Sequence, residues 1–148
     1  MNFVIYTDAA HNPETTATGI GYVIHTDEHF VAMDAVPIGK MPSIPAESVA
    51  ILTAIEQLED KVNLASSDTV TIYTDNLKVV RYINGIEIVR GEHEEVIRKT
   101  VRAYKNLSQK CNVSIQWVQG HGKDYSQNNL VDRLAKYSIR YQQLKKGC

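Results

Sequence analysis

The chain has 148 residues, 43% apolar and 22% charged, which is the composition of a globular domain and not of a disordered segment. It contains two cysteines and no apolar run of about 18 residues, which excludes a disulfide scaffold, a zinc site built from cysteines and a membrane-spanning helix. The formal net charge is −1, but residues 1–74 carry −8 and residues 75–148 carry +7, which indicates either an anionic partner or a fold that mixes the two halves.

The hydrophobic pattern predicts strands and helices in a mixed order. The first half of the chain is predicted to form strands over residues 2–7, 19–26 and 30–36, then a helix that begins at the proline-rich residues 42–45 and ends near Lys61. The second half is predicted to form a strand over 69–74, helices over 76–83 and 92–110, a strand over 113–118, a loop over 120–125 and a helix over 126–146. We therefore predict an α/β fold with a mixed five-stranded sheet, an antiparallel meander of three strands plus two parallel strands, flanked by helices.

Length and pattern predict a single domain over residues 1–148. The first residues lack the basic start and the small-residue cleavage site of a signal peptide. Together with the low cysteine content, this favours a protein of the reducing cytoplasm. We expect a monomer with no membrane partner.

Two aspartates directly follow predicted strands and have the same flanking residues. Asp8 ends the segment Ile-Tyr-Thr-Asp, and Asp75 ends a second copy of it. Ligands of open α/β sheets bind beyond the carboxyl ends of the strands, so the two side chains are candidates for one site. The alternative is that each is a turn residue or a helix cap.

Two further carboxylates are candidates for the same site. Glu47 lies in the first turn of its helix, where the helix dipole also favours an acid, and Ile51 four residues later places it on the face that packs on the sheet. Asp132, in the second turn of the last helix, is either partly buried or a solvent-exposed neighbour of Lys136. Four converging carboxylates repel one another unless cations neutralise them, and Mg²⁺ is the expected ion. Two such ions, about 3.5–4 Å apart, can hold a phosphodiester for attack by water.

Several motifs through nearly the whole chain occur together in order. They are Tyr6-Thr7-Asp8, Gly19-Ile20-Gly21, Ala46-Glu47, Tyr73-Thr74-Asp75-Asn76, Trp117-Val118-Gln119-Gly120-His121, Asn128 and Val131-Asp132-Arg133-Leu134-Ala135. In these motifs the chain resembles the ribonuclease H family, type 1, in a bacterial-like, single-domain form without a marked basic protrusion. The combination of a tryptophan-bearing strand, a Gly-His loop and an Asn-x-x-x-Asp helix is the most specific part.

The resemblance implies a metal-dependent nuclease. The four metal-binding, catalytic carboxylates of the family are matched by Asp8, Glu47, Asp75 and Asp132. His121 matches the loop histidine that assists proton transfer or product departure. The family hydrolyses the RNA strand of RNA–DNA hybrids with Mg²⁺ or Mn²⁺, two ions per site with substrate, and leaves 5′-phosphate and 3′-hydroxyl ends. The expected partner is therefore a nucleic acid.

The residues expected to contact substrate include the chain's departures from the family pattern. Ser43 and Ile44 stand where two asparagines are common, and Leu77 replaces a polar residue. RNA is distinguished from DNA through its 2′-hydroxyl groups, so fewer polar side chains weaken strand selectivity. The residues expected to bind substrate are Asn12, Ser43, Asn76, Lys78, Lys123 and, in a supporting role, Asn128. The cations of the helix over 92–110 are either phosphate contacts or a solvated helix face.

Other functions remain open on the sequence. A ribonuclease H-like nucleic-acid-binding or scaffold module with little or no turnover would share these motifs, and the departures at Ser43, Ile44 and Leu77 favour it. The order of the carboxylates fits an integrase, a junction resolvase or a 3′–5′ exonuclease less well. A small-molecule enzyme would need a phosphate-binding glycine motif or a nucleophile elbow, and the sequence has neither. Trp117 is expected in the core.

Overall fold

The computed structural model describes the backbone of residues 1–119 and 126–146, and the side chains of residues 1–119 and 130–140. The elements in chain order are β1 (Asn2–His11), β2 (Ala17–His25), β3 (Phe30–Lys40), α1 (Ser43–Lys61), β4 (Thr69–Thr74), α2 (Leu77–Ile83), α3 (Glu94–Lys110), β5 (Asn112–Trp117) and α4 (Ser126–Lys146). Their order and type are those predicted, and most boundaries agree to within a few residues.

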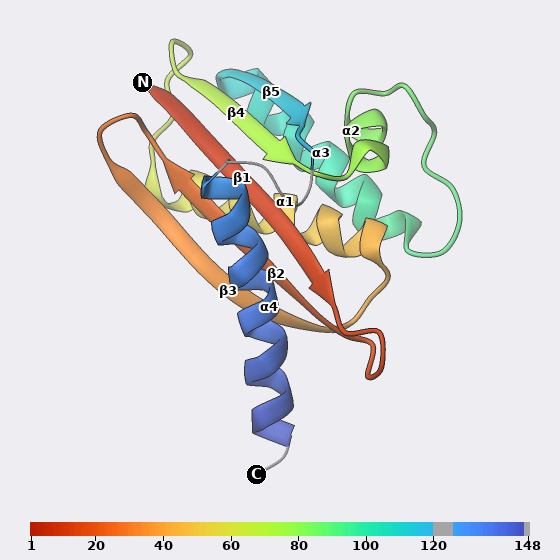
Figure 1. The fold of residues 1–148 in the computed structure, drawn as a ribbon. Coiled ribbons are helices and arrows are strands. Elements are labelled where there is room, and N and C mark those ends of the chain that lie inside the picture. Colours follow the sequence, from red (N-terminus) through yellow and green to blue (C-terminus); the bar gives the residue numbers. More distant parts are fainter. Residues whose placement is uncertain (120–125, 147–148) are drawn as a thin grey trace.

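The strands form one five-stranded sheet in the order β3-β2-β1-β4-β5 (Figure 1). The pairs β3-β2 and β2-β1 are antiparallel, whereas β1-β4 and β4-β5 are parallel. Parallel neighbours require a crossover connection, and α1 supplies one while α2 and α3 supply the other. The predicted fold class, a meander of three strands plus two parallel strands flanked by helices, is confirmed.

One face of the sheet packs on α1 and forms the main hydrophobic core. Ile5 of β1, Ile24 of β2 and Ile72 of β4 are fully buried together with Ile51 and Ile55 of α1. Figure 1 shows α1 and α3 behind the sheet and α4 in front of it. Among the described residues, no helix has the length and apolar character that crossing a membrane requires.

The opposite face of the sheet accepts α4 only because β2 carries glycines there. A Cβ atom built on Gly21 would lie 2.7 Å from the Leu134 Cβ and 2.7 Å from the Val131 carbonyl oxygen. A Cβ atom on Gly19 would lie 2.6 Å from the Ala135 carbonyl oxygen. These glycines bring the backbone of α4 close to β2, and this close packing sets where the first half of α4 stands over the sheet.

The first strand is longer than the predicted range of residues 2–7. Its parallel pairing with β4 stops at Tyr6 opposite Tyr73, but its antiparallel pairing with β2 continues to His11 opposite Thr18. Asp8 therefore lies within β1 and not beyond its end. The sequence pattern underestimates the length of this strand because the second half of β1 pairs with β2 alone.

We predict that Gly21→Ala destabilises the protein by about 2–3 kcal/mol, because the added methyl group would overlap atoms of α4 that cannot move independently. Urea unfolding followed by circular dichroism measures the loss. Gly39→Ala is the control, since nothing lies within 4 Å of a Cβ atom there and only its positive φ of 81° is unfavourable. That control should cost about 1 kcal/mol. Equal stability of Gly21→Ala and the unmodified chain would contradict the packing described here.

Candidate active site

Two of the central carboxylates come from neighbouring parallel strands. Asp8 lies in β1, Asp75 directly follows β4, and the register places Tyr6 opposite Tyr73. Because both strands carry the same four residues in the same register, Asp8 and Asp75 occupy equivalent positions at one end of the sheet. The pairing of β1 with β4 ends at these tyrosines, so the two aspartates lie just beyond the last paired residues of the two strands.

The third central carboxylate, Glu47, is contributed by the first half of α1. It is only 5% exposed, as predicted for the inner face of the helix. The backbone N–H of Ala9 donates to both acids, to Asp8 Oδ1 at 2.9 Å and to Glu47 Oε1 at 3.2 Å. One oxygen from each of Asp8, Glu47 and Asp75 lies within 4.8 Å of the others. The structure therefore brings three of the four predicted carboxylates into one cluster.

Burial and mutual repulsion oppose the ionisation of this cluster. Desolvation, and then the charges of Asp75 and Asp132, raise the pKa of Asp8 to about 8. Desolvation, and then the charges of Asp8 and Asp75, raise the pKa of Glu47 well above its ordinary value. The shared N–H of Ala9 lowers both pKa values but offsets only part of the increase. Without a cation, the buried pair therefore retains a proton near neutral pH.

The cluster fits a divalent cation that prefers oxygen ligands. Three carboxylates supply such ligands at once, and Mg²⁺ and Mn²⁺ are the ions that favour them. The second oxygen of Glu47, Oε2, is buried and has no hydrogen-bond partner within the described part of the chain. A buried oxygen without a donor is costly, and a bound cation would satisfy it. This unpartnered oxygen is the structural argument for a metal.

Asp132, the fourth predicted carboxylate, stands at the edge of the cluster. It is not among the three acids whose carboxylate oxygens lie within 4.8 Å of one another, but its charge contributes to the raised pKa of Asp8. Its Oδ2 accepts from the Lys136 ammonium at 2.9 Å, one helical turn further along α4. The side chain is about 20% exposed, which agrees with the partly buried alternative and not with the solvent-exposed one.

The two asparagines predicted to bind substrate have structural roles as well. Asn12 Oδ1 accepts the backbone N–H groups of Glu14 and Thr15, which tightens the turn after β1. Asn76 Oδ1 accepts the N–H of Val79 and caps the N-terminus of α2. In both residues the amide oxygen is engaged, and the amide NH₂ group is the part that can donate to a substrate.

The remaining predicted substrate residues differ in how far the structure describes them. Ser43 is exposed at the first position of α1. Lys78 forms an ion pair with Glu87 at 2.7 Å, which the sequence analysis did not anticipate. His121 and Lys123 lie outside the described residues, and so does the side chain of Asn128.

Sequence reasoning missed the position of Trp117. It is 48% exposed and not in the core, because it ends β5 at the edge of the sheet. Its indole N–H donates to the backbone carbonyl of Asp75 at 3.0 Å and so fixes the chain where β4 ends. The signal that could have indicated this position is the motif itself, in which the tryptophan stands three residues before Gly120 of the Gly-His loop.

The comparisons with known proteins agree with this arrangement. The sequence matches the family described as RNase H over residues 1–140. The chain belongs to the RNase H family. This confirms the expected family and the enzyme class, a ribonuclease H. No curated protein sequence matches the chain at a significant level.

Solved structures of RNase H proteins share the fold at low sequence identity. RNase H1 from Halobacterium salinarum NRC-1 is 23% identical with a TM-score of 0.74, covering 95% of this chain and 98% of its own. The N-terminal RNase H domain of a Mycobacterium tuberculosis protein is 21% identical with a TM-score of 0.76, covering 98% of both chains. LC11-RNase H1, solved in complex with an RNA/DNA hybrid, is 20% identical with a TM-score of 0.73, covering 95% of this chain and 99% of its own.

We predict that Asp8→Asn stabilises the metal-free protein near pH 8. Folding raises the pKa of Asp8 from 3.8 to about 8, so the unfolded chain releases the proton first. The folded state is therefore favoured most below about pH 4 and loses stability as the pH rises towards 8. The amide removes this loss and keeps the bond from Ala9. Since a tenfold change in proton affinity corresponds to about 1.4 kcal/mol, we expect a gain of roughly 2 kcal/mol or more.

Thermal unfolding in EDTA at a series of pH values measures this effect. Asp27→Asn, at an exposed turn between β2 and β3, is the matched control and should change stability little at any pH. A gain for Asp8→Asn that does not shrink towards pH 4 would show that relief of charge is not its cause.

We also predict that Mg²⁺ raises the melting temperature, and more at about pH 8 than at about pH 5, because protons on Asp8 and Glu47 compete with the metal. At a concentration of 100 times the dissociation constant, a bound ion contributes about 2.7 kcal/mol. EDTA should reverse the shift, and Glu47→Gln should reduce it. An equal Mg²⁺ shift in Glu47→Gln would place the ion elsewhere.

Proposed function

We propose that this chain is a metal-dependent endonuclease that hydrolyses the RNA strand of RNA–DNA hybrids and leaves 5′-phosphate and 3′-hydroxyl ends. The observation that carries the proposal is the cluster of Asp8, Glu47 and Asp75, in which the buried Glu47 Oε2 has no hydrogen-bond partner among the described residues, in a chain of the RNase H family. The hybrid as substrate is supported by the related LC11-RNase H1, whose structure was solved in complex with one.

We infer that Asp8, Glu47 and Asp75 hold the metal, with Asp132 completing the site at its edge. When bound, two Mg²⁺ or Mn²⁺ ions would supply an activated water and stabilise the charge that develops on the phosphate. The protein's own contribution is to hold the acids in place. Ala9 holds two of them through one backbone N–H. The residue that anchors the backbone at Asp75 is Trp117.

Proton transfer and strand recognition are assigned to residues around this cluster. His121 is proposed to move a proton to or from the reacting groups, or to assist product departure, because an imidazole titrates near neutral pH. Substrate contacts are proposed for Asn12, Ser43, Asn76, Lys78, Lys123 and Asn128. Asn12 and Asn76 would use their amide NH₂ groups, since their amide oxygens already accept backbone N–H groups.

A nucleic-acid-binding module with little turnover is the second candidate. The observation that favours it is Leu77, which is 43% exposed at the start of α2, two residues after Asp75. An exposed leucine in this position offers no hydrogen bond to a 2′-hydroxyl group. This candidate predicts binding of the hybrid without hydrolysis.

We predict that an end-labelled RNA–DNA hybrid is cut in its RNA strand with Mg²⁺ or Mn²⁺, and that Asp75→Asn reduces the rate by at least about 100-fold by removing a metal ligand. Asp27→Asn is the matched control and should cut normally. RNA duplex, DNA duplex and single strands should remain intact. Cutting that persists in EDTA would contradict the metal-dependent mechanism. Binding of the hybrid by folded protein without cutting would support the non-catalytic module instead.

A further inference from the structure

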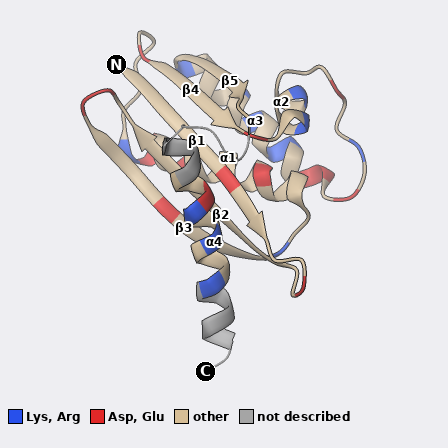
Figure 2. Cartoon of the chain, viewed as in Figure 1, with Lys and Arg blue, Asp and Glu red and all other residues tan. Residues whose placement is uncertain are grey.

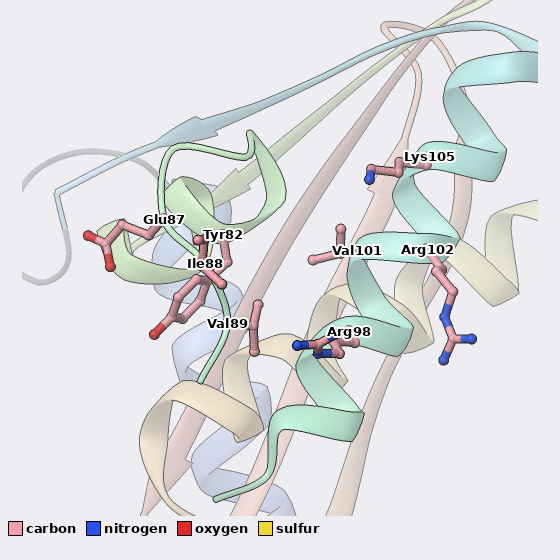
Figure 3. Close-up of a pocket in the computed structure, with 8 residues that line it drawn as sticks. All are labelled: Tyr82, Glu87, Ile88, Val89, Arg98, Val101, Arg102 and Lys105. Carbon is pink, nitrogen blue, oxygen red and sulfur yellow. The ribbon is translucent and has the colours of Figure 1, made fainter. Parts of the chain in front are cut away.

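A hollow of about 460 Å³ lies between α3 and the segment that follows α2, away from the carboxylate cluster (Figure 3). One wall is the segment containing Ile88 and Val89, and the other is the side of α3 that carries Val101. Tyr82, the penultimate residue of α2, also lines it. Asp75 precedes the opposite end of α2, so the hollow and the cluster lie at the two ends of this helix.

The interior of the hollow is aliphatic and open to solvent. Figure 3 shows Val89 and Val101 directed into the space between the two walls. Ile88, which lines the hollow, is 71% exposed. An exposed isoleucine beside an open apolar hollow is unfavourable in water and favours a surface that another molecule covers.

The rim of the hollow on α3 is cationic. Arg98 and Lys105 lie about two turns apart on one face of α3, and Figure 3 shows both side chains directed towards the opposite wall. Lys105 forms no ion pair with any described residue. Arg98 pairs with Glu94 through Nη2 alone, at 2.6 Å, which uses part of the five donors of a guanidinium group. Both cations can therefore bind carboxylates of a partner.

The acidic residue of the hollow does not neutralise this rim. Figure 3 shows the Glu87 carboxylate directed away from α3. It forms ion pairs with Lys78 at 2.7 Å and Arg81 at 3.4 Å, both from α2. In Figure 2 blue positions, which mark Lys and Arg, recur along α3. The hollow therefore combines an aliphatic interior with a positively charged edge.

We propose that this hollow is a docking site for an acidic, amphipathic segment of a partner protein. A bulky apolar side chain of the segment would fill the space between Val89 and Val101, and flanking carboxylates would pair with Arg98 and Lys105. A nucleic-acid duplex fits less well, because it binds through its phosphates and would use the cations of the rim but leave the aliphatic interior uncovered. The proposal does not depend on the catalytic function, since none of these residues belongs to the carboxylate cluster.

The test uses the whole chain and a short fluorescein-labelled peptide of Asp and Glu residues around one Leu and one Phe. Fluorescence anisotropy in EDTA measures its affinity, which we expect to be on the order of tens of micromolar for so small an interface. Two further probes serve as comparison, one with Ser in place of Leu and Phe, and one with Lys in place of the acids. Amide chemical-shift changes in NMR spectra locate the bound peptide and report that each variant is folded.

Two variants with matched controls test the two halves of the site. The double variant Arg98→Gln, Lys105→Gln should reduce the affinity for the acidic peptide about five- to tenfold. Its control, the double variant Lys61→Gln, Lys99→Gln, removes the same charge outside the hollow and should change this affinity little. Ile88→Ser should reduce the affinity for the acidic peptide about tenfold. Its control is Ile86→Ser, which should not reduce this affinity because Ile86 does not line the hollow.

Several outcomes would overturn the proposal. The first is equal affinity for the three peptides. The second is amide chemical-shift changes that are confined to residues outside the hollow. The third is an equal loss of affinity in the variants and in their controls. A hybrid duplex that displaces the peptide and loses affinity in the Arg98 and Lys105 variant would make the surface a nucleic-acid contact. Self-association that depends on Ile88 would make it an interface between copies of the chain. Failure of this test leaves hybrid cleavage by the carboxylates unaffected, so the two proposals fail separately.

Discussion

The concentration of negative charge at one end of the sheet is the constraint on which the rest of the structure depends. Asp8 and Glu47 are nearly buried, and Asp75 lies within 4.8 Å of both through its carboxylate. Such a cluster opposes folding, because each charge is desolvated and repelled by the others. The surrounding packing has to hold it in place: isoleucines fix α1 against the sheet, and the glycines of β2 fix α4 on the other face.

Much of this arrangement could be predicted from the sequence because local and long-range signals coincide. The repeated segment Ile-Tyr-Thr-Asp predicts two equivalent strands, and the observed register places Ile5 opposite Ile72 and Tyr6 opposite Tyr73. The apolar spacing of α1 likewise predicts the burial of Glu47. In each case one residue pattern fixes both the type of element and the face that it buries, so the assignment of these carboxylates to β1, β4 and α1 follows without knowledge of distant contacts.

Other features depend on contacts that no local pattern encodes. Asp8 lies within β1 because β2 keeps pairing after β4 has stopped, which is a property of the neighbours and not of the strand. Trp117 has the composition of a core residue, yet it ends an edge strand and binds a backbone carbonyl 42 residues away. The outer position of Asp132 depends on how closely α4 packs on the sheet, because its neighbours Val131 and Leu134 lie directly against Gly21 of β2.

Glu87, in the segment after α2, links the charges near the carboxylate cluster to those beside the hollow. Lys78 and Arg81 lie on the helix that begins beside Asp75, and both pair with Glu87 in the segment beyond the helix. A phosphate that binds Lys78 has to replace Glu87 as its partner, so the gain from this contact is smaller than that from a lysine without a pair. The same pairing directs Glu87 away from α3, so no described acid faces Lys105 across the hollow, nor Arg98, which pairs with Glu94 of its own helix. Glu87 therefore competes with the phosphate contact proposed for Lys78 at one end of α2, and it does not neutralise the cations of α3 at the other end.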